Sequence, residues 1–107
     1  VHNADHKILY ELAASDNMWK QRIATVSTLM LIRHGQYSDT IKLAELFLNT
    51  RHDLMQKAVG WVLREVGKRD KDLLILFLER YKTKMPRTML RYAIEKFSPD
   101  QRRYFMS

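Results

Sequence analysis

Cysteine is absent from this 107-residue sequence, which excludes disulfides, thiol catalysis and thiolate metal sites and agrees with a reducing cytoplasm. Only three glycines occur, and because they are scattered they cannot form a Gly-rich phosphate-binding loop. No stretch approaches the about 20 continuous apolar residues of a membrane span, and the first residues lack the pattern of a signal peptide. We therefore expect a cytoplasmic protein without a cofactor.

Positive charge is abundant and unevenly distributed. The sequence has 19 Lys and Arg against 12 Asp and Glu, for a net charge of +7. Residues 1–50 carry five charges of each sign, whereas residues 51–107 carry fourteen cations and seven anions, so the whole excess lies in the second half. With 46% apolar residues, the chain can bury a core as a single domain. The charge imbalance favours an anionic partner such as nucleic acid.

Apolar residues recur at helical spacing along the whole chain, and no run alternates with the period of a strand. Cap-forming residues, Gly35 and two prolines divide this pattern into segments. The expected caps are Ser15, Asp16 or Asn17 for the second helix, Ser38 and Asp39 for the third, Asp70 or Asp72 for the fifth and Ser98 for the last. The expected helices cover residues 4–14, 18–34, 38–49, 53–69, 70–82 and 86–97, with a short last helix from about residue 98. The residues expected to face inward in the second helix include Trp19, Ile23, Val26 and Met30.

The expected helices form pairs that recur. The second members of the pairs begin near residues 16, 53 and 86, and these steps lie in the range of two-helix solenoid repeats. In a finer register, a cation stands two residues before an apolar one at Arg22, Lys57 and Arg91, which are 35 and 34 residues apart. The sequence therefore predicts an all-α superhelix of six or seven helices in stacked antiparallel pairs, with these cations along one edge of the inner helices.

The stretch from residue 56 to residue 69, QKAVGWVLREVGKR, has two contrasting faces when it is drawn as a helix. The apolar face, which must be buried, has Met55, Val59, Val62, Leu63 and Val66. The opposite stripe has Lys57, Trp61, Arg64 and Lys68, at i, i+4, i+7 and i+11. Three cations around an indole suit nucleic acid, a polyanion with flat bases. The alternative is a solvated face whose tryptophan is half-buried against a neighbouring helix.

Three segments, DNMWKQRIATVSTLMLIRHG, KAVGWVLREVGKRD and MPRTMLRYAIEKF, resemble the C-terminal half of the AlkD-like DNA alkylation-repair glycosylases, and the resemblance covers nearly the whole chain. It implies a curved stack of HEAT-like helical pairs with duplex DNA on its basic concave face. It also implies hydrolysis of the N-glycosidic bond of cationic N3- or N7-alkylated purines, without the base flipping that is usual for enzymes acting on bases. The charged base is already a good leaving group, so the protein need only stabilise the sugar oxocarbenium that develops.

The resemblance assigns roles to three residues of this chain. Arg22 matches a family arginine that contacts the DNA backbone near the lesion. Trp61 matches the tryptophan that walls the lesion site, and Arg64 matches an arginine that grips phosphate. From the helical-face argument we add Lys57 and Lys68 as further residues that neutralise phosphates. Together these five form the expected binding site for double-stranded DNA.

The catalytic aspartate of the family is missing from the matched part. In the family it lies in an upstream segment of the outline W-x-x-V-D, and neither Asp5 nor Asp16 has a tryptophan four residues before it. We therefore expect residues 1–107 to be the C-terminal, DNA-holding part of a protein about twice as long, and to lack glycosylase activity alone. Trp19 stands among apolar neighbours and is expected in the core.

Other constellations carry less weight. His2 and His6 are four residues apart, but two ligands near a terminus make a poor metal site, so no metal is expected. Glu65 is expected to be ionised and to hold an arginine in place, while Arg91 either neutralises a phosphate or holds the last two helices together. A second hypothesis is a non-catalytic helical-repeat scaffold that binds an acidic protein, because a shared fold does not by itself carry function.

Overall fold

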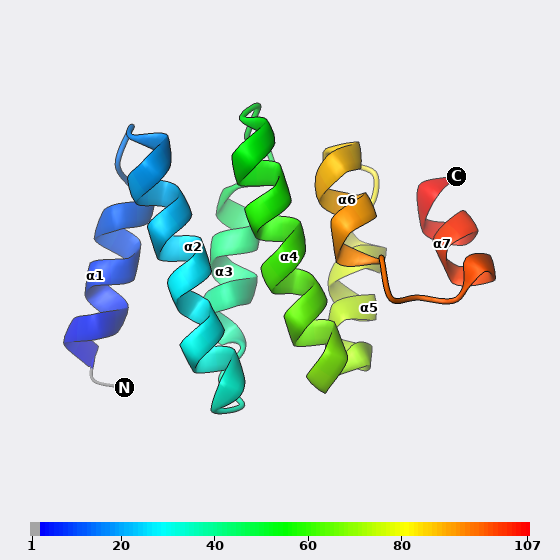
Figure 1. Ribbon diagram of the computed structural model, residues 1–107, viewed down its shortest axis with the longest axis horizontal. Helices are drawn as coiled ribbons and strands as arrows, with labels where there is room; N and C mark the ends of the chain where they lie inside the picture. Colours follow the sequence, from blue (N-terminus) through cyan, green and yellow to red (C-terminus); the bar gives the residue numbers. More distant parts are fainter. Residues whose placement is uncertain (1–2) are drawn as a thin grey trace.

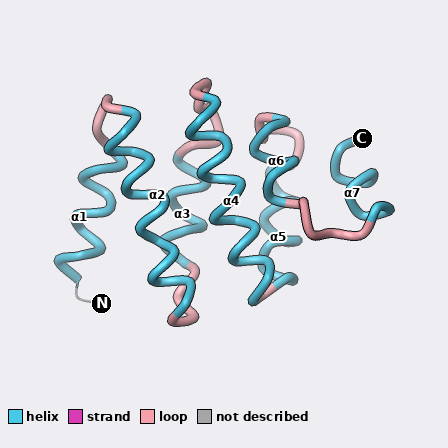
Figure 2. Tube along the Cα trace, viewed as in Figure 1, coloured by secondary structure: helices cyan, strands magenta, loops and turns pink. Residues whose placement is uncertain are grey.

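The computed structural model describes residues 3–107, and over this range every regular element is a helix (Figures 1 and 2). The helices are α1 (Asn3–Ala13), α2 (Met18–Arg33), α3 (Ser38–Leu46), α4 (Asp53–Arg69), α5 (Lys71–Tyr81), α6 (Arg87–Ala93) and α7 (Pro99–Met106). Only α3 and α6 end several residues before their expected limits. The described helices are all too short or too polar to cross a membrane. The predicted all-α fold is confirmed.

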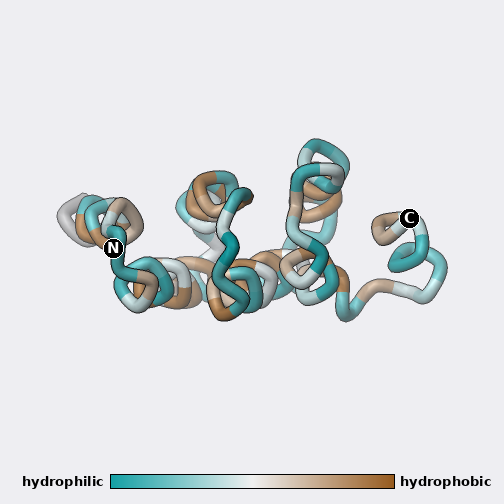
Figure 3. The backbone as a smooth tube through the Cα atoms, turned by 90° about the horizontal axis from the view of Figure 1, so that it is seen from above, coloured by the Kyte–Doolittle hydropathy of each residue, from teal (hydrophilic) through white to brown (hydrophobic). Residues whose placement is uncertain are grey.

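The helices are stacked in two layers, which are clearest from above (Figure 3). In one layer α2, α4 and α6 lie side by side, and α1, α3 and α5 form the other layer. The central helix is α4, which packs against α2 and α6 within its layer and against α3 and α5 across it. The last helix, α7, packs against α6, and the whole stack measures 41 × 29 × 18 Å. The layer of α2, α4 and α6, which we call the inner layer, therefore brings these three helices onto one face.

Several helix ends are set by the caps that the sequence predicts. The side chain of Asn17 accepts two backbone N–H groups at the start of α2, at 2.8 and 3.2 Å. After α2, Gly35 has a φ of +75°, and the N–H of the following residue donates to the Leu31 carbonyl at 2.8 Å, as in a Schellman motif. Asp70 caps α5 and Ser98 caps α7 through their side chains. These caps set both ends of α2 and the starts of α5 and α7.

The apolar face of α4 forms the centre of the core, as predicted. Its fully buried residues are Met55, Val59, Val62, Leu63 and Val66. At Gly60, an added Cβ would lie 2.5 Å from the Cβ of Tyr92 and 2.6 Å from the carbonyl oxygen of Met89. At Gly67, an added Cβ would overlap the side chain of Leu74. The two glycines therefore let α6 and α5 approach α4 closely.

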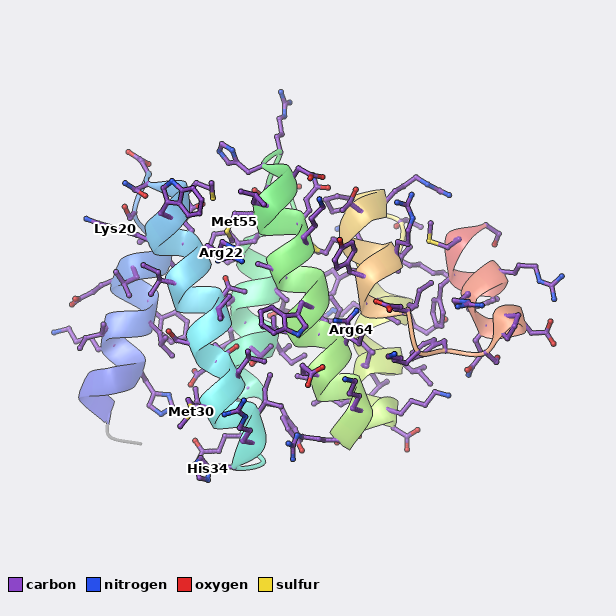
Figure 4. The ribbon with its side chains drawn as sticks, viewed as in Figure 1. Lys20, Arg22, Met30, His34, Met55 and Arg64 are labelled. Atoms are coloured by element: carbon purple, nitrogen blue, oxygen red, sulfur yellow. The ribbon has the colours of Figure 1, made fainter. Side chains whose placement is uncertain are left out.

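The predicted buried face of α2 is wrong. Trp19, Ile23 and Met30 are 58%, 55% and 55% exposed, and Figure 4 shows Met30 on the side of α2 away from α4. The residues that are buried instead are Ala24, Thr25, Thr28, Leu31 and Ile32. The two threonine hydroxyls donate to backbone carbonyl oxygens of α2 at 3.0 and 2.7 Å, so these polar groups can be buried at low cost. Small residues on this face let the neighbouring helices approach, which apolar spacing alone does not predict.

The predicted capping of α3 by Ser38 and Asp39 is also wrong, because the N-cap position is Tyr37 and no side chain caps the helix. Asp39 is buried. Its carboxylate accepts a hydrogen bond from the hydroxyl of Tyr10 at 2.6 Å and also contacts Nδ1 of His6. Burial, followed by the hydrogen bond and charge of Asp39, raises the pKa of Tyr10 well above its usual value. Asp39 therefore ties α3 to α1.

Candidate nucleic-acid interface

A groove of about 250 Å³ lies where the three inner helices meet. Its lining residues are Arg22, Leu54, Lys57, Ala58, Trp61, Arg64 and Tyr92. Four of the five predicted DNA-binding residues therefore share one groove, although they come from two helices. Figure 4 shows Arg22 between α2 and α4, and Arg64 on the side of α4 next to α6. The groove, which we call the indole groove, combines three cations with two aromatic rings.

Lys57 stands in this groove with a carboxylate beside it. Its Nζ lies 3.0 Å from Oδ2 of Asp53, one helical turn earlier. The hydrogen bond to Asp53, the charge of that carboxylate and the nearby Tyr92 together raise the pKa of Lys57 above its usual value. Lys57 therefore carries its positive charge at every physiological pH. Because the pair is exposed to solvent it is weak, so a phosphate can replace Asp53.

Arg64 is mostly buried, and its partner is a residue that sequence reasoning did not identify. Its side chain is 17% exposed, and its Nη1 forms an ion pair with the carboxylate of Glu95, in the turn after α6. Its Nε is buried without a hydrogen-bond partner among the described residues. The guanidinium is therefore held firmly between α4 and α6, and a phosphate would have to compete with Glu95 for it.

The fifth predicted residue, Lys68, does not line the indole groove. It lines an adjoining pocket that shares Arg64 with the groove, and its Nζ lies 2.8 Å from Oε2 of Glu65. The prediction that Glu65 holds an arginine is therefore wrong. Residues three apart share a face of a helix and adjacent residues do not, so Glu65 reaches Lys68 and the more distant Glu95 holds Arg64.

Tyr92 is a groove residue that the sequence reasoning missed. The step of 35 residues from Arg22 to Lys57, taken once more, ends at Tyr92 and not at Arg91. Arg91 is exposed and is not among the residues that line the groove. The contact between α6 and α7 uses a different arginine, because Nη1 of Arg87 donates to the carbonyl of Met106 at 3.2 Å. A strict 35-residue register was the signal that could have found Tyr92.

The remaining candidates stand apart from the indole groove. Trp19, predicted in the core, is exposed on α2 and does not line the groove. His2 lies outside the described residues, and His6 pairs with Asp39. Over the part of the chain that the structure describes, no three His, Asp or Glu side chains are grouped as metal ligands.

The fold and the groove define a helical-repeat protein with a cationic, aromatic groove across its inner helices. The family model described as DNA alkylation repair enzyme matches residues 1–97. The chain therefore belongs to the DNA alkylation repair enzyme family. No curated protein and no solved structure is significantly similar to the chain.

Proposed function

We propose that these 107 residues form the DNA-binding part of a DNA glycosylase that excises cationic N3- or N7-alkylated purines. The observation that carries this proposal is the convergence of Arg22, Lys57 and Arg64 with Trp61 in one groove. Cations at such a surface neutralise phosphates, and an indole gives a flat face to a base or sugar. Membership of the DNA alkylation repair enzyme family supports the same ligand. Since that ligand is chromosomal DNA, we also propose a cytoplasmic protein associated with the nucleoid.

The proposed reaction needs a group that the indole groove does not contain. The bond between C1′ of the sugar and the purine nitrogen breaks, and its electron pair leaves with the cationic base, which becomes neutral. Water adds to C1′ and releases a proton, which leaves a hydroxyl group on the sugar. Positive charge develops on the sugar, so the transition state is stabilised by an anion and not by further cations. None of the seven lining residues carries a carboxylate. We therefore propose that these residues hold the DNA, and that a carboxylate from outside the chain completes the catalytic site.

Binding to duplex DNA that carries an abasic-site analogue tests this proposal. Fluorescence anisotropy at several salt concentrations would compare the wild type with Arg22→Ala, Arg64→Ala and Trp61→Ala. Each arginine change should make the slope of log K against log salt shallower by about 0.9. Trp61→Ala should weaken binding by about 1–3 kcal/mol at an unchanged slope, because stacking is not ionic. Lys42→Ala is the matched control, since Lys42 is exposed on α3 in the other layer.

Two outcomes would contradict the proposal in different ways. Release of N7-methylguanine from DNA by these 107 residues alone would show that the catalytic group is present in the chain. Indifference of the wild type to DNA, together with binding to polyglutamate that Arg22→Ala weakens, would favour the acidic-protein scaffold. Both assays use the same purified chain, so the two outcomes are separable.

A further inference from the structure

A second basic pocket adjoins the indole groove at the C-terminal end of α4. It encloses about 180 Å³ between α4, α5 and the end of α6. Its lining residues are Arg64, Gly67, Lys68, Lys71, Leu74, Ala93, Lys96 and Phe97. Four of these eight carry a positive charge and none carries a negative one. Only two of the four cations, Arg64 and Lys68, belong to the predicted DNA-binding set.

The positive charge around this pocket is only partly neutralised. Among the residues that the structure describes, two cations of the pocket form ion pairs: Arg64 with Glu95, and Lys68 with Glu65. Within the same described residues, neither Lys71 nor Lys96 forms an ion pair with a carboxylate. Two net positive charges therefore face one small pocket, and their mutual repulsion would be relieved by an anion.

Lys71 is held at the rim by groups that leave its charge uncompensated. Its Nζ donates to Oε1 of Gln101 on α7 at 3.0 Å and lies 4.9 Å from the centroid of the Phe97 ring. A neutral amide and an aromatic face orient the ammonium group without cancelling its charge. Leu74, Ala93 and Phe97 form an apolar floor below the cations. The arrangement suits a compact anion that sits on the rim.

The position of the pocket relates it to the indole groove. Both are lined by Arg64. The stripe along α4 begins in the indole groove at Lys57 and ends in the second pocket at Lys68. Eleven residues of helix span about 16 Å at 1.5 Å per residue. Phosphates of one DNA strand recur about every 3.4 Å along the duplex axis, so this length spans several of them. A strand that ran along α4 from the groove would therefore place further phosphates within reach of the pocket.

We propose that the pocket of Lys68, Lys71 and Lys96 binds a phosphate group, and that in the complex this group belongs to the DNA backbone beyond the indole groove. The choice of DNA as the source rests on the proposed function. The phosphate chemistry rests on the charge and geometry of the pocket alone. Lys71 and Lys96 are the residues that this proposal adds to the interface.

The test uses the full chain with Lys71→Gln and Lys96→Gln combined, which removes two charges and keeps polar side chains that are only one atom shorter. Lys42→Gln combined with Lys84→Gln is the matched control, because both lysines are exposed and line neither the groove nor the pocket. Loss of one phosphate contact should make the salt slope shallower by about 0.9, or about fivefold weaker DNA binding at 0.15 M salt. Circular dichroism melting checks that both double variants fold.

Titration with inorganic phosphate forms the second arm, followed through the amide resonances of Gly67 and Phe97. Saturable shifts in the wild type that vanish in the pocket variant are expected. Shifts that do not saturate, or that persist in the variant, would overturn the phosphate site. If phosphate binds but the pocket variant keeps the wild-type salt slope, the pocket takes free anions and the DNA assignment is overturned. If the wild type ignores DNA, the proposed function fails, and the phosphate titration alone decides the pocket.

Discussion

The close contact between α4 and α6 at Gly60 gives a sharp prediction for the variant Gly60→Ala. The added methyl carbon would lie 2.5 Å from the Cβ of Tyr92 and 2.6 Å from the carbonyl oxygen of Met89. Neither atom is the flexible end of a side chain, because both are fixed by the backbone of α6. Relief of the clash therefore requires α6 to move away from α4 as a body, which also displaces Tyr92 from the indole groove.

The expected size of the effect follows from two opposing terms. Overpacking a well-packed core typically costs about 1–3 kcal/mol, and a contact with backbone lies toward the upper end. Alanine gains about 1 kcal/mol over glycine in helix propensity. We therefore expect Gly60→Ala to lower the free energy of unfolding by about 1–2 kcal/mol. The shift of Tyr92 should also weaken DNA binding.

Gly67→Ala in the same helix is the matched control. Its added methyl group would meet mainly the end of the Leu74 side chain, which can rotate away, and it gains the same helix propensity. We expect it to change stability by less than about 1 kcal/mol. Urea denaturation followed by circular dichroism measures both variants, and an unchanged m value would show that the comparison is valid. Gly60→Ala at least as stable as Gly67→Ala would refute the reasoning.

Three further predictions concern single side chains. Tyr10→Phe should lower the free energy of unfolding by about 1.5 kcal/mol, because a hydrogen bond to the Asp39 carboxylate is lost. The native state keeps Tyr10 protonated because its pKa is raised, so wild-type stability should fall as pH rises above about 10, where the tyrosine of the unfolded chain ionises. Urea denaturation at each pH should show a less steep fall in the variant. Thr40→Val should raise the thermal midpoint, because the Thr40 hydroxyl is buried without a partner among the described residues and its desolvation costs about 1–3 kcal/mol; a lower midpoint would contradict this. Glu95→Gln releases Arg64 from a partly exposed ion pair. It should therefore tighten DNA binding, measured by fluorescence anisotropy, by less than about fivefold and lower stability slightly. Weaker binding would instead show that Glu95 positions Arg64.

The sequence predicted the helix ends best where a local signal marks them. Asn17, Gly35, Asp70 and Ser98 act within one or two turns of their own positions, and the structure confirms each of them. The buried face of α4 was equally clear, because its two faces differ strongly in polarity. Local chemistry was sufficient wherever the competing faces of a helix were distinct.

The buried face of α2 could not be predicted by the same reasoning. Its helix has apolar residues on both sides, and the buried side was the one with Thr25 and Thr28. Whether those hydroxyls are satisfied depends on their rotamers, which composition does not reveal. The partner of Arg64 was missed for a related reason. Glu95 is 31 residues away, so the pairing exists only once α6 has packed against α4.

Helix α4 both fills the core and carries the binding side chains, so its packing against the neighbouring helices couples stability to DNA binding. One face of the helix fills the core, the opposite face supplies Lys57, Trp61 and Arg64 to the groove, and its last turn supplies Lys68 to the second pocket. A substitution that tilts α4 on its buried side must therefore move all of these groups together. It follows that loss of DNA binding is informative about a contact only when stability is unchanged. Exposed changes such as Lys71→Gln and Lys96→Gln are expected to meet that condition, which the melting measurement checks. Changes at Gly60 do not meet it, because they alter the packing and the interface at once.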